Sequence, residues 1–453
     1  MSVRFNNLRR IVQLAAGLTS ILLAPQSTLA ATDIALWHAM PGELGYRIDK
    51  LAKDFNAAQH DYRVVPTFKG LYTETMLAAL FAMRAHQHPA IVQVAEVGTA
   101  SMMAAKNAIV AVATLMREQH EAFAPADYLP VIAGYYSDTA GDLLSFPFNA
   151  STPILYYNKD QFRFAGLDAD SSPATWPQLA AAAERLRAAG YACGFTTHYP
   201  SWVNVENFLA LHGLPVATSA NGMAGLDARL LIDSPLMVRH LAALTGWQKT
   251  GVFQYAGRTT RGEQKFAAHE CGIFLGSSAS RADFVAQANF EIGYGMLPYY
   301  PDVAGAPRNS IIGGGSLWAL RDRPDAEYKG VAKFFAFLSR PQVQAEWHQT
   351  TGYLPVTRAA YELTRSQGFY DKNPGADLPV RQLTRGTVTP NSKGLRLGRL
   401  VEIRNIIYEE MEKGFQGGQT AQQAMDNAVA RGDKVLRAFQ KSVKLSMPTK
   451  TAP

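Results

Sequence analysis

Strand and helix patterns alternate along the chain from residue 33. Strand patterns cover residues 33–38, 62–68 and 91–95, and helical patterns lie between them over residues 48–55 and 72–85. Alternation with short links is typical of an α/β domain with a largely parallel sheet. Such sheets bind ligands in the loops at the carboxyl ends of their strands. Two loops are therefore candidate binding segments. One is residues 38–42, and the other begins at Glu96.

A second α/β unit is predicted from about residue 150. It follows a long extended segment, residues 146–157, whose two prolines disfavour a helix. A helix is then expected after Thr175, which forms a capping box with Gln178. Further strand patterns occur at residues 193–196, 272–275 and 294–297. The chain of 453 residues is long enough for two or three domains, yet no linker rich in Pro, Gly and Ser divides it. We therefore expect two lobes between which the chain crosses more than once.

The first thirty residues have the pattern of a secretory signal peptide. An apolar run over residues 11–24 lies between three arginines and the small-residue cleavage pattern Thr28-Leu29-Ala30. The alternative is a short N-terminal anchor helix, although the run is only about half as long as a membrane span. Removal of this segment lowers the formal charge from +7 to +4.

Two cysteines are too few for a disulfide scaffold or a cysteine-rich zinc site. Export to an oxidising compartment makes Cys193 and Cys271 a candidate disulfide if their strands are neighbours. Two separate buried thiols are the alternative.

The remaining positive charge is densest over residues 381–404, where the basic residues are Arg381, Arg385, Lys393, Arg396, Arg399 and Arg404. Aromatic residues for base stacking are missing there, which argues against nucleic acid. The stretch is either a solvated face or an anion site built around one arginine, whose guanidinium offers two parallel hydrogen bonds to a phosphate.

Motifs of catalysis and cofactor binding are absent. The sequence has no His-Glu-x-x-His pattern, no Gly-x-Ser-x-Gly elbow, no P-loop and no Gly-x-Gly-x-x-Gly after a strand. The close pair His86 and His88 is a poor metal site by itself. We therefore predict neither a metal nor a cofactor, and no enzymatic activity.

Five segments together resemble a known family. They are residues 93–99 (QVAEVGT), 148–159 (FNASTPILYYNK), 311–318 (IIGGGSLW), 351–356 (TGYLPV) and 393–398 (KGLRLG). The chain resembles the periplasmic sn-glycerol-3-phosphate-binding components of Ugp-type ABC importers, which are extracellular solute-binding proteins of family 1. The resemblance extends from the signal peptide to about Lys441. The TGYLP element is shared with many sugar-binding relatives, whereas its combination with the GLRLG stretch and Arg404 is more specific.

This resemblance implies a two-lobed periplasmic binding protein fold of type II that closes around its ligand by hinge bending. We expect a first lobe of residues 31–146 plus about 305–357, and a second lobe of residues 147–304 plus about 358–453. The implied function is import of sn-glycerol-3-phosphate, and of glycerophosphodiesters such as glycerophosphocholine. The implied partners are a membrane permease with its ATPase subunits, the location is the periplasm, and the protein is expected to be a monomer.

The resemblance also implies a set of ligand contacts, which are Tyr72, Glu96, Ser151, Ser277, Gly314, Tyr353 and Arg404. In this set Arg404 supplies the positive charge for a phosphate, and the hydroxyls and the glycine backbone supply neutral donors. The carboxylate of Glu96 suits the hydroxyls of glycerol. Tyr199 and Trp202 either contact the ligand, by cation–π attraction to a choline group, or pack the lobe surface. Tyr199 is a departure, since relatives carry a tryptophan there.

Two other functions are compatible with the sequence. A sugar or oligosaccharide receptor on the same scaffold would rely on aromatic stacking and not on Arg404. A secreted phosphodiesterase would need catalytic groups, which the missing motifs disfavour.

Overall fold

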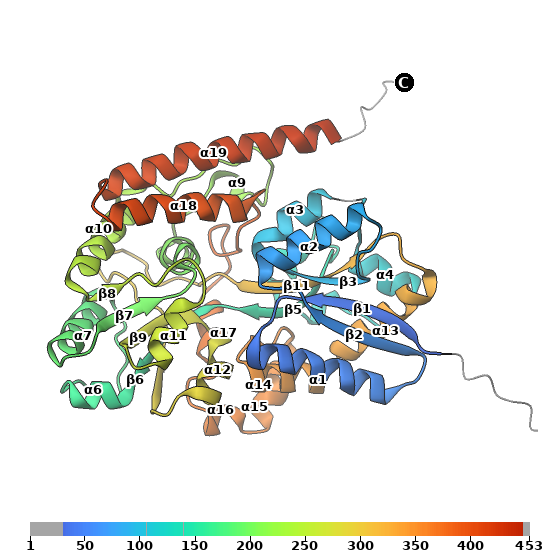
Figure 1. The fold of residues 1–453 in the computed structure, drawn as a ribbon, viewed down its shortest axis with the longest axis horizontal. Helices are drawn as coiled ribbons and strands as arrows, with labels where there is room; N and C mark the ends of the chain where they lie inside the picture. The colour runs from blue at the N-terminus through green and yellow to red at the C-terminus, as the bar shows by residue number, and fades with distance from the viewer. Residues whose placement is uncertain (1–29, 106, 139, 447–453) are drawn as a thin grey trace, which may run out of the picture.

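Two mixed sheets, one in each lobe, confirm the predicted α/β fold with two lobes (Figure 1). The structure is a computed structural model that describes residues 30–446 except 106 and 139. The predicted signal peptide lies outside the described residues apart from Ala30. Within the described range, no helix combines the length and the hydropathy needed to cross a membrane.

The first sheet has the strand order β2-β1-β3-β11-β4, with β5 paired to β11. Its strands are β1 (Thr32–His38), β2 (Tyr62–Phe68), β3 (Ile91–Ala95), β4 (Ile109–Val110), β5 (Phe146–Ser151) and β11 (Gly313–Leu320). The three strands predicted near the N-terminus are parallel, whereas β11 runs antiparallel to its neighbours β3, β4 and β5. The sheet is therefore parallel only where consecutive strands are joined by helices.

Helices cover both faces of the first sheet. They are α1 (Gly42–Ala58), α2 (Tyr72–Arg84), α3 (Thr99–Ala104), α4 (Val112–Glu118), α5 (Pro130–Tyr136), α13 (Asp325–Leu338) and α14 (Pro341–Thr351). Ile48 and Phe55 of α1 pack with Phe335 of α13 in one core cluster. Ala79 of α2 packs with Val94 on the opposite face. The helical spacing in the sequence thus marks the faces that lose contact with water.

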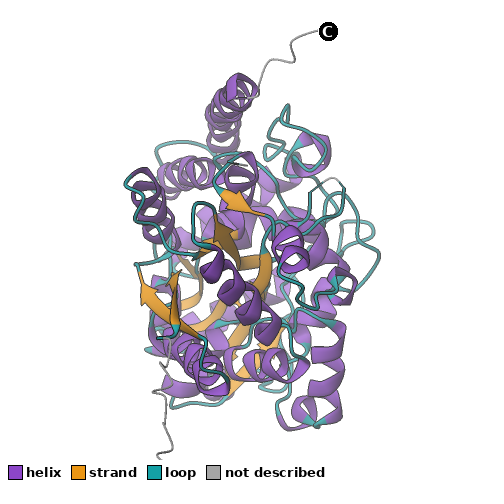
Figure 2. Cartoon of the chain, turned by 90° about the vertical axis from the view of Figure 1, so that its right-hand side faces the viewer, coloured by secondary structure: helices purple, strands orange, loops and turns teal. Residues whose placement is uncertain are grey.

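The second sheet has the order β10-β6-β9-β7-β8. Its strands are β6 (Pro153–Asn158), β7 (Cys193–Thr197), β8 (Phe253–Gln254), β9 (Cys271–Ser277) and β10 (Ile292–Gly295). Its helices are α6 (Lys159–Phe164), α7 (Trp176–Ala188), α8 (Phe208–Leu211), α9 (Thr218–Asn221), α10 (Pro235–Thr250), α11 (Arg261–Ala267), α12 (Ser280–Gln287), α18 (Leu400–Phe415) and α19 (Ala421–Ser446). The predicted capping box of Thr175 and Gln178 begins α7. Figure 2 shows most strands in the middle of the molecule between helices, with a few strands at its left-hand edge.

The extended segment 146–157 is two strands that belong to different sheets. β5 pairs with β11 in the first sheet, and β6 pairs with β9 and β10 in the second. The change occurs at the buried Thr152, whose hydroxyl donates to the carbonyl of Ile311, in a second crossing segment. The crossing therefore lies a few residues beyond the expected boundary at residue 146.

Three further helices, α15 (Arg358–Ser366), α16 (Phe369–Lys372) and α17 (Leu378–Leu383), follow α14. We expected this part in the second lobe, but α17 contacts both lobes. Leu383 packs into the core cluster of the first sheet. Gln382 donates to the carbonyl of Pro153 and accepts from the amide of Leu297, both near the second sheet.

A disulfide joins Cys193 and Cys271, which face one another in the register of the parallel strands β7 and β9. Of the two alternatives that the sequence left open, the structure shows the bond. Both residues are fully buried. The cross-link ties together positions 78 residues apart in the chain.

We predict that replacing both cysteines by alanine lowers the free energy of unfolding by about 4 kcal/mol, because the bond restricts a long loop of the unfolded chain. Denaturant titrations with and without a reductant check this. Reductant should destabilise the natural chain and leave the double variant unchanged. A natural chain that does not respond to reduction under unfolding conditions would contradict the prediction.

Candidate functional site

A cavity of about 250 Å³ lies between the two lobes. Its walls include the carboxyl ends of strands from both sheets. Glu96 follows β3 and Ser151 ends β5, while His198 follows β7 and Ser277 ends β9. These are the positions at which α/β sheets present ligand-binding residues.

All nine residues expected at the site line this one cavity, although they come from distant parts of the chain. They are Tyr72, Glu96, Ser151, Tyr199, Trp202, Ser277, Gly314, Tyr353 and Arg404. The sequence reasoning missed several charged and polar residues of the wall, namely His198, Arg258, Glu263, Asp283, Asn405 and Tyr408. Asn405 and Tyr408 lie within four residues of Arg404 on α18, and this helical spacing is the signal that would have found them. Within the described part of the chain, no group of three His, Cys, Asp or Glu side chains has the arrangement of a metal site.

Arg404, which we expected to supply the positive charge for a phosphate, is already paired with two carboxylates. Its Nε and Nη2 donate to the two carboxylate oxygens of Glu206, both at 2.7 Å, and Nη2 also donates to Oε1 of Glu96 at 2.8 Å. Glu206 belongs to the second lobe, and Glu96 belongs to the first. The guanidinium therefore links the lobes across the cavity. The expected fork toward a phosphate is largely occupied by these carboxylates.

The three charged groups of this cluster are well buried, with side-chain exposures of 11% for Arg404, 8% for Glu96 and 2% for Glu206. Burial raises the pKa of Glu96 above its ordinary value, and the opposing effect of Arg404 does not cancel the shift. Burial lowers the pKa of Arg404, but the charges of Glu206 and Glu96 outweigh it and raise that pKa well above its ordinary value. Arg404 is therefore a permanent cation.

Glu206 was not predicted as a site residue from the sequence. It lies in a π-helical turn, Trp202–Asn207, which follows the loop after β7. Such turns are frequent at functional sites. Glu206 lies four residues after Trp202, which is one of the expected site residues. This spacing was the signal in the sequence that could have identified Glu206.

A chain of buried amides orients Tyr72. The amide nitrogen of Asn149 donates to the Tyr72 hydroxyl oxygen at 2.8 Å, and the amide oxygen of Asn149 accepts from Gln93 at 2.9 Å. Gln93 in turn accepts from the backbone of Ala39 at 2.8 Å. Because the Tyr72 oxygen already accepts one bond, its own proton is left to be donated. Burial raises the pKa of Tyr353, the second phenol of this wall, to about 12.

Ser277 and Gly314 are fixed by backbone contacts. The amide of Ser277 donates to Nε2 of His198 at 2.7 Å, so this ring nitrogen is the unprotonated one. Gly314 has a φ of +87°, and a Cβ there would lie 1.9 Å from the carbonyl oxygen of Asn149. Only glycine fits this position of β11.

Tyr199 has a φ of +40°, a conformation that a residue with a side chain rarely adopts. Backbone strain of this kind is concentrated at functional sites. The ring packs edge-on against His198 with a centroid distance of 5.0 Å. Trp202 is 4% exposed, and its indole N–H has no hydrogen-bond partner among the described residues.

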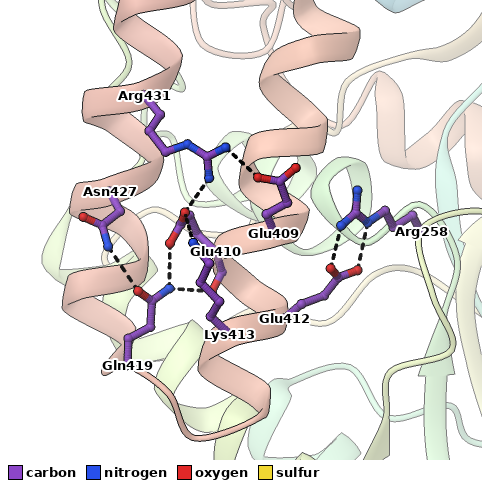
Figure 3. A network of polar contacts seen from close by, with 8 residues as sticks. All are labelled: Arg258, Glu409, Glu410, Glu412, Lys413, Gln419, Asn427 and Arg431. Carbon is purple, nitrogen blue, oxygen red and sulfur yellow. Dashed lines mark hydrogen bonds and ion pairs between the residues drawn. The ribbon is translucent and has the colours of Figure 1, made fainter.

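Polar contacts also anchor α18, the helix of Arg404, to α19 and to Arg258 of the cavity wall (Figure 3). Glu410 is 1% exposed and accepts from Lys413, Gln419 and Arg431. Farther along the helix, both carboxylate oxygens of Glu412 accept from Arg258, whose third guanidinium nitrogen has no contact in the drawn network.

Some basic residues of the stretch 381–404 lie on a solvated face, and one lies at the candidate anion site. Arg381 and Arg399 form exposed ion pairs with nearby acids of the chain. Arg396 donates to three backbone carbonyls at the end of α5 and so connects the lobes. Of the basic residues in this stretch, Arg404 is the one that lines the cavity.

Comparison with known proteins identifies the family. The sequence pattern described as "Bacterial extracellular solute-binding protein" matches residues 50–376, which is more than half of the chain. The chain belongs to this family. The membership confirms the prediction of a binding protein rather than an enzyme.

Full-length relatives confirm the more specific resemblance. The sn-glycerol-3-phosphate-binding periplasmic protein UgpB of Salmonella typhimurium is 48% identical over 431 residues, which cover 95% of this chain and 98% of that protein. The UgpB of Escherichia coli is 49% identical over 416 residues, covering 92% of this chain and 95% of that protein.

Solved structures of two ligand-bound proteins share the fold. UgpB from Mycobacterium tuberculosis in complex with glycerophosphocholine matches with a TM-score of 0.77 and 22% identity, over 91% of this chain and all of that one. The maltose-bound MalE3 of T. maritima matches with a TM-score of 0.72 and 18% identity, over 89% of this chain and all of that one. At these identities the likeness establishes the two-lobed fold alone.

We predict that Gly314→Ala lowers the free energy of unfolding by about 3 kcal/mol or more, because it adds a backbone clash to the cost of a left-handed alanine. Gly417→Ala is the matched control, since Gly417 has a φ of +80° and open space around its Cβ position. It should cost only about 1 kcal/mol. Chemical denaturation measures both, and equal losses would contradict the role given to the clash.

We predict that Glu410 makes stability depend on acid pH. Burial raises its pKa, but hydrogen bonds from Lys413, Gln419 and Arg431 outweigh this and lower the pKa from 4.5 to about 2. Since the folded pKa is the lower one, the stabilisation is complete above about pH 4.5 and is lost as the pH falls toward 2. The loss amounts to about 3 kcal/mol.

Unfolding free energies measured from pH 7 to pH 2 check this prediction. Glu410→Gln should lower stability at neutral pH and flatten the acid decline. Glu409→Gln is the control, because the side chain of Glu409 is 40% exposed and pairs with the same Arg431. An acid decline that is equally steep in Glu410→Gln and the natural chain would show that other groups cause it.

Proposed function

We propose that this chain is the periplasmic solute-binding component of an ABC importer for sn-glycerol-3-phosphate and for glycerophosphodiesters such as glycerophosphocholine. The observation that carries the proposal is that the seven ligand contacts implied by the family resemblance, together with Tyr199 and Trp202, all line one cavity between the lobes. Similarity to proteins named for glycerol-3-phosphate binding along nearly the whole chain supports it.

In this proposal the phosphate lies between Nη1 of Arg404 and a set of neutral donors. Nη1 is the guanidinium nitrogen to which the described structure gives no hydrogen-bond partner. The donors are the hydroxyls of Tyr72, Ser151 and Ser277 and the backbone at Gly314. The hydroxyl of Tyr353 donates to Sδ of Met40 at 3.2 Å and would exchange this partner for the ligand. Micromolar affinity needs about 8 kcal/mol. A hydrogen bond to a charged group contributes about 1.5–3 kcal/mol, so several of these donors have to act together.

The glycerol end of the ligand is placed next to the carboxylate of Glu96 in this proposal. Its Oε1 accepts from Arg404, and no hydrogen bond to Oε2 from the side chain of another described residue competes with a ligand. A free carboxylate oxygen accepts hydrogen bonds from hydroxyl donors. A choline group of a diester would meet the rings of Tyr199 and Trp202, and a quaternary ammonium is attracted to aromatic faces.

The remaining steps of transport follow from the family. The lobes close around the ligand by hinge bending, and a membrane permease with its ATPase subunits receives it. The chain performs no chemistry in this process and acts as a monomer.

Isothermal titration calorimetry of the natural chain with glycerol-3-phosphate, glycerophosphocholine and maltose tests the proposal. The two phosphate ligands should bind and maltose should not. Binding of maltose alone would favour a sugar receptor, and release of choline from glycerophosphocholine would favour a phosphodiesterase.

We predict that Ser277→Ala weakens glycerol-3-phosphate binding by about tenfold, because one hydrogen bond to a charged group is lost. Ser366→Ala is the control, since Ser366 lies at the exposed end of α15. Ser277→Ala also removes the acceptor of the Ala279 amide, so thermal unfolding without ligand should show a modest loss for this variant and a smaller one for the control, and affinities are compared where both are folded. Unchanged affinity in Ser277→Ala would remove this serine from the phosphate contacts.

A further inference from the structure

Glu206 is the most deeply buried charge of the site, and it does not itself line the cavity. It accepts both bonds of a bidentate pair from Arg404 and a third bond from the hydroxyl of Ser201 at 3.1 Å. Arg404 and Ser201 both belong to the second lobe, so these contacts do not depend on lobe closure. The carboxylate therefore acts on the site through Arg404.

The bonds to Glu206 decide which edge of the guanidinium remains for a ligand. Nε and one N–H of Nη2 are held by Glu206, and the other N–H of Nη2 is held by Glu96. Nη1 has no hydrogen-bond partner among the described residues, and its residue, Arg404, lines the cavity. A planar guanidinium cannot turn one nitrogen without turning the others, so a bidentate partner fixes its whole orientation.

The cluster also carries an excess of negative charge. One guanidinium faces two carboxylates, so the net charge is −1 when all three are ionised. Arg258, another arginine of the cavity wall, is paired with Glu412 (Figure 3). The wall also contains Glu263 and Asp283, and no ion pair joins either of them to an arginine or lysine within the described residues.

Such a charge balance discriminates between phosphate ligands. A phosphomonoester carries close to two negative charges near pH 7.5, because its second pKa is about 6, whereas a phosphodiester carries one. The buried charge of Glu206 repels each ligand in proportion to the ligand's charge, and burial weakens the screening by water and salt.

We propose that Glu206 is a positioning and specificity-determining residue, which turns Nη1 of Arg404 toward the ligand and disfavours phosphomonoesters relative to phosphodiesters. This inference rests on the proposed function, since it assumes that phosphate ligands occupy the cavity. In this proposal Glu206, which lies outside the cavity wall, contributes to the selectivity between phosphomonoesters and phosphodiesters.

The test compares two ligands that differ in phosphate charge and lack a cationic headgroup. They are glycerol-3-phosphate and its methyl diester, titrated calorimetrically into the natural chain and into Glu206→Gln at about pH 7.5. Neutralising Glu206 should shift the ratio of the two dissociation constants by about tenfold or more in favour of the monoester. A merely structural role would weaken both ligands together and leave the ratio unchanged, and that result overturns the proposal.

Two variants serve as controls. Glu206→Asp keeps the charge, so the ratio should stay within about twofold of the natural one even if both affinities fall. If Glu206→Gln does not fold, Glu206→Asp still decides, because a large shift of the ratio with the charge retained overturns the proposal. Glu409→Gln removes a charge from α18 outside the cavity wall and should leave the ratio unchanged. A natural chain that binds neither ligand would instead refute the proposed function.

Discussion

The ion pairs between Arg404 and two carboxylates connect the two lobes of this molecule. Glu206 fixes the guanidinium within the second lobe, and Glu96 reaches it from the first. All three groups are buried, and a buried charge without a partner is costly, so each group depends on the others. The orientation of the Arg404 guanidinium, in which only Nη1 is left without a partner among the described residues, follows from this cluster.

The surrounding structure serves to place these groups. α18 carries Arg404 on the side that faces the cavity, while Glu410 and Glu412 tie the same helix to Arg431 and Arg258 (Figure 3). The strand ends of both sheets supply the neutral donors. Hydroxyls held by backbone or amide contacts, as at Tyr72, lose little further freedom when a ligand arrives, which is the general advantage of a preorganised site.

Much of the fold could be predicted, because the relevant signals are local. The first three strands were located to within one residue, and the capping box correctly marked the start of α7. The boundary between the lobes was less accurate, since residues 146–157 give one continuous extended pattern although the strand changes sheets at Thr152. A pattern of extended residues contains no information about the partner strand. The pairing of Cys193 with Cys271 stayed open for the same reason.

The sequence by itself determined the two α/β units through periodicity, and its motifs determined the resemblance to a family. That resemblance in turn implied nine candidate residues, which are among those that line the cavity. Only the tertiary structure decided what surrounds Arg404. Glu206 is 198 residues away from it and Glu96 is 308 residues away. Ion pairs over such separations are set by how the lobes pack. The charge of Arg404 is therefore compensated by two carboxylates, and one guanidinium nitrogen is left for a ligand.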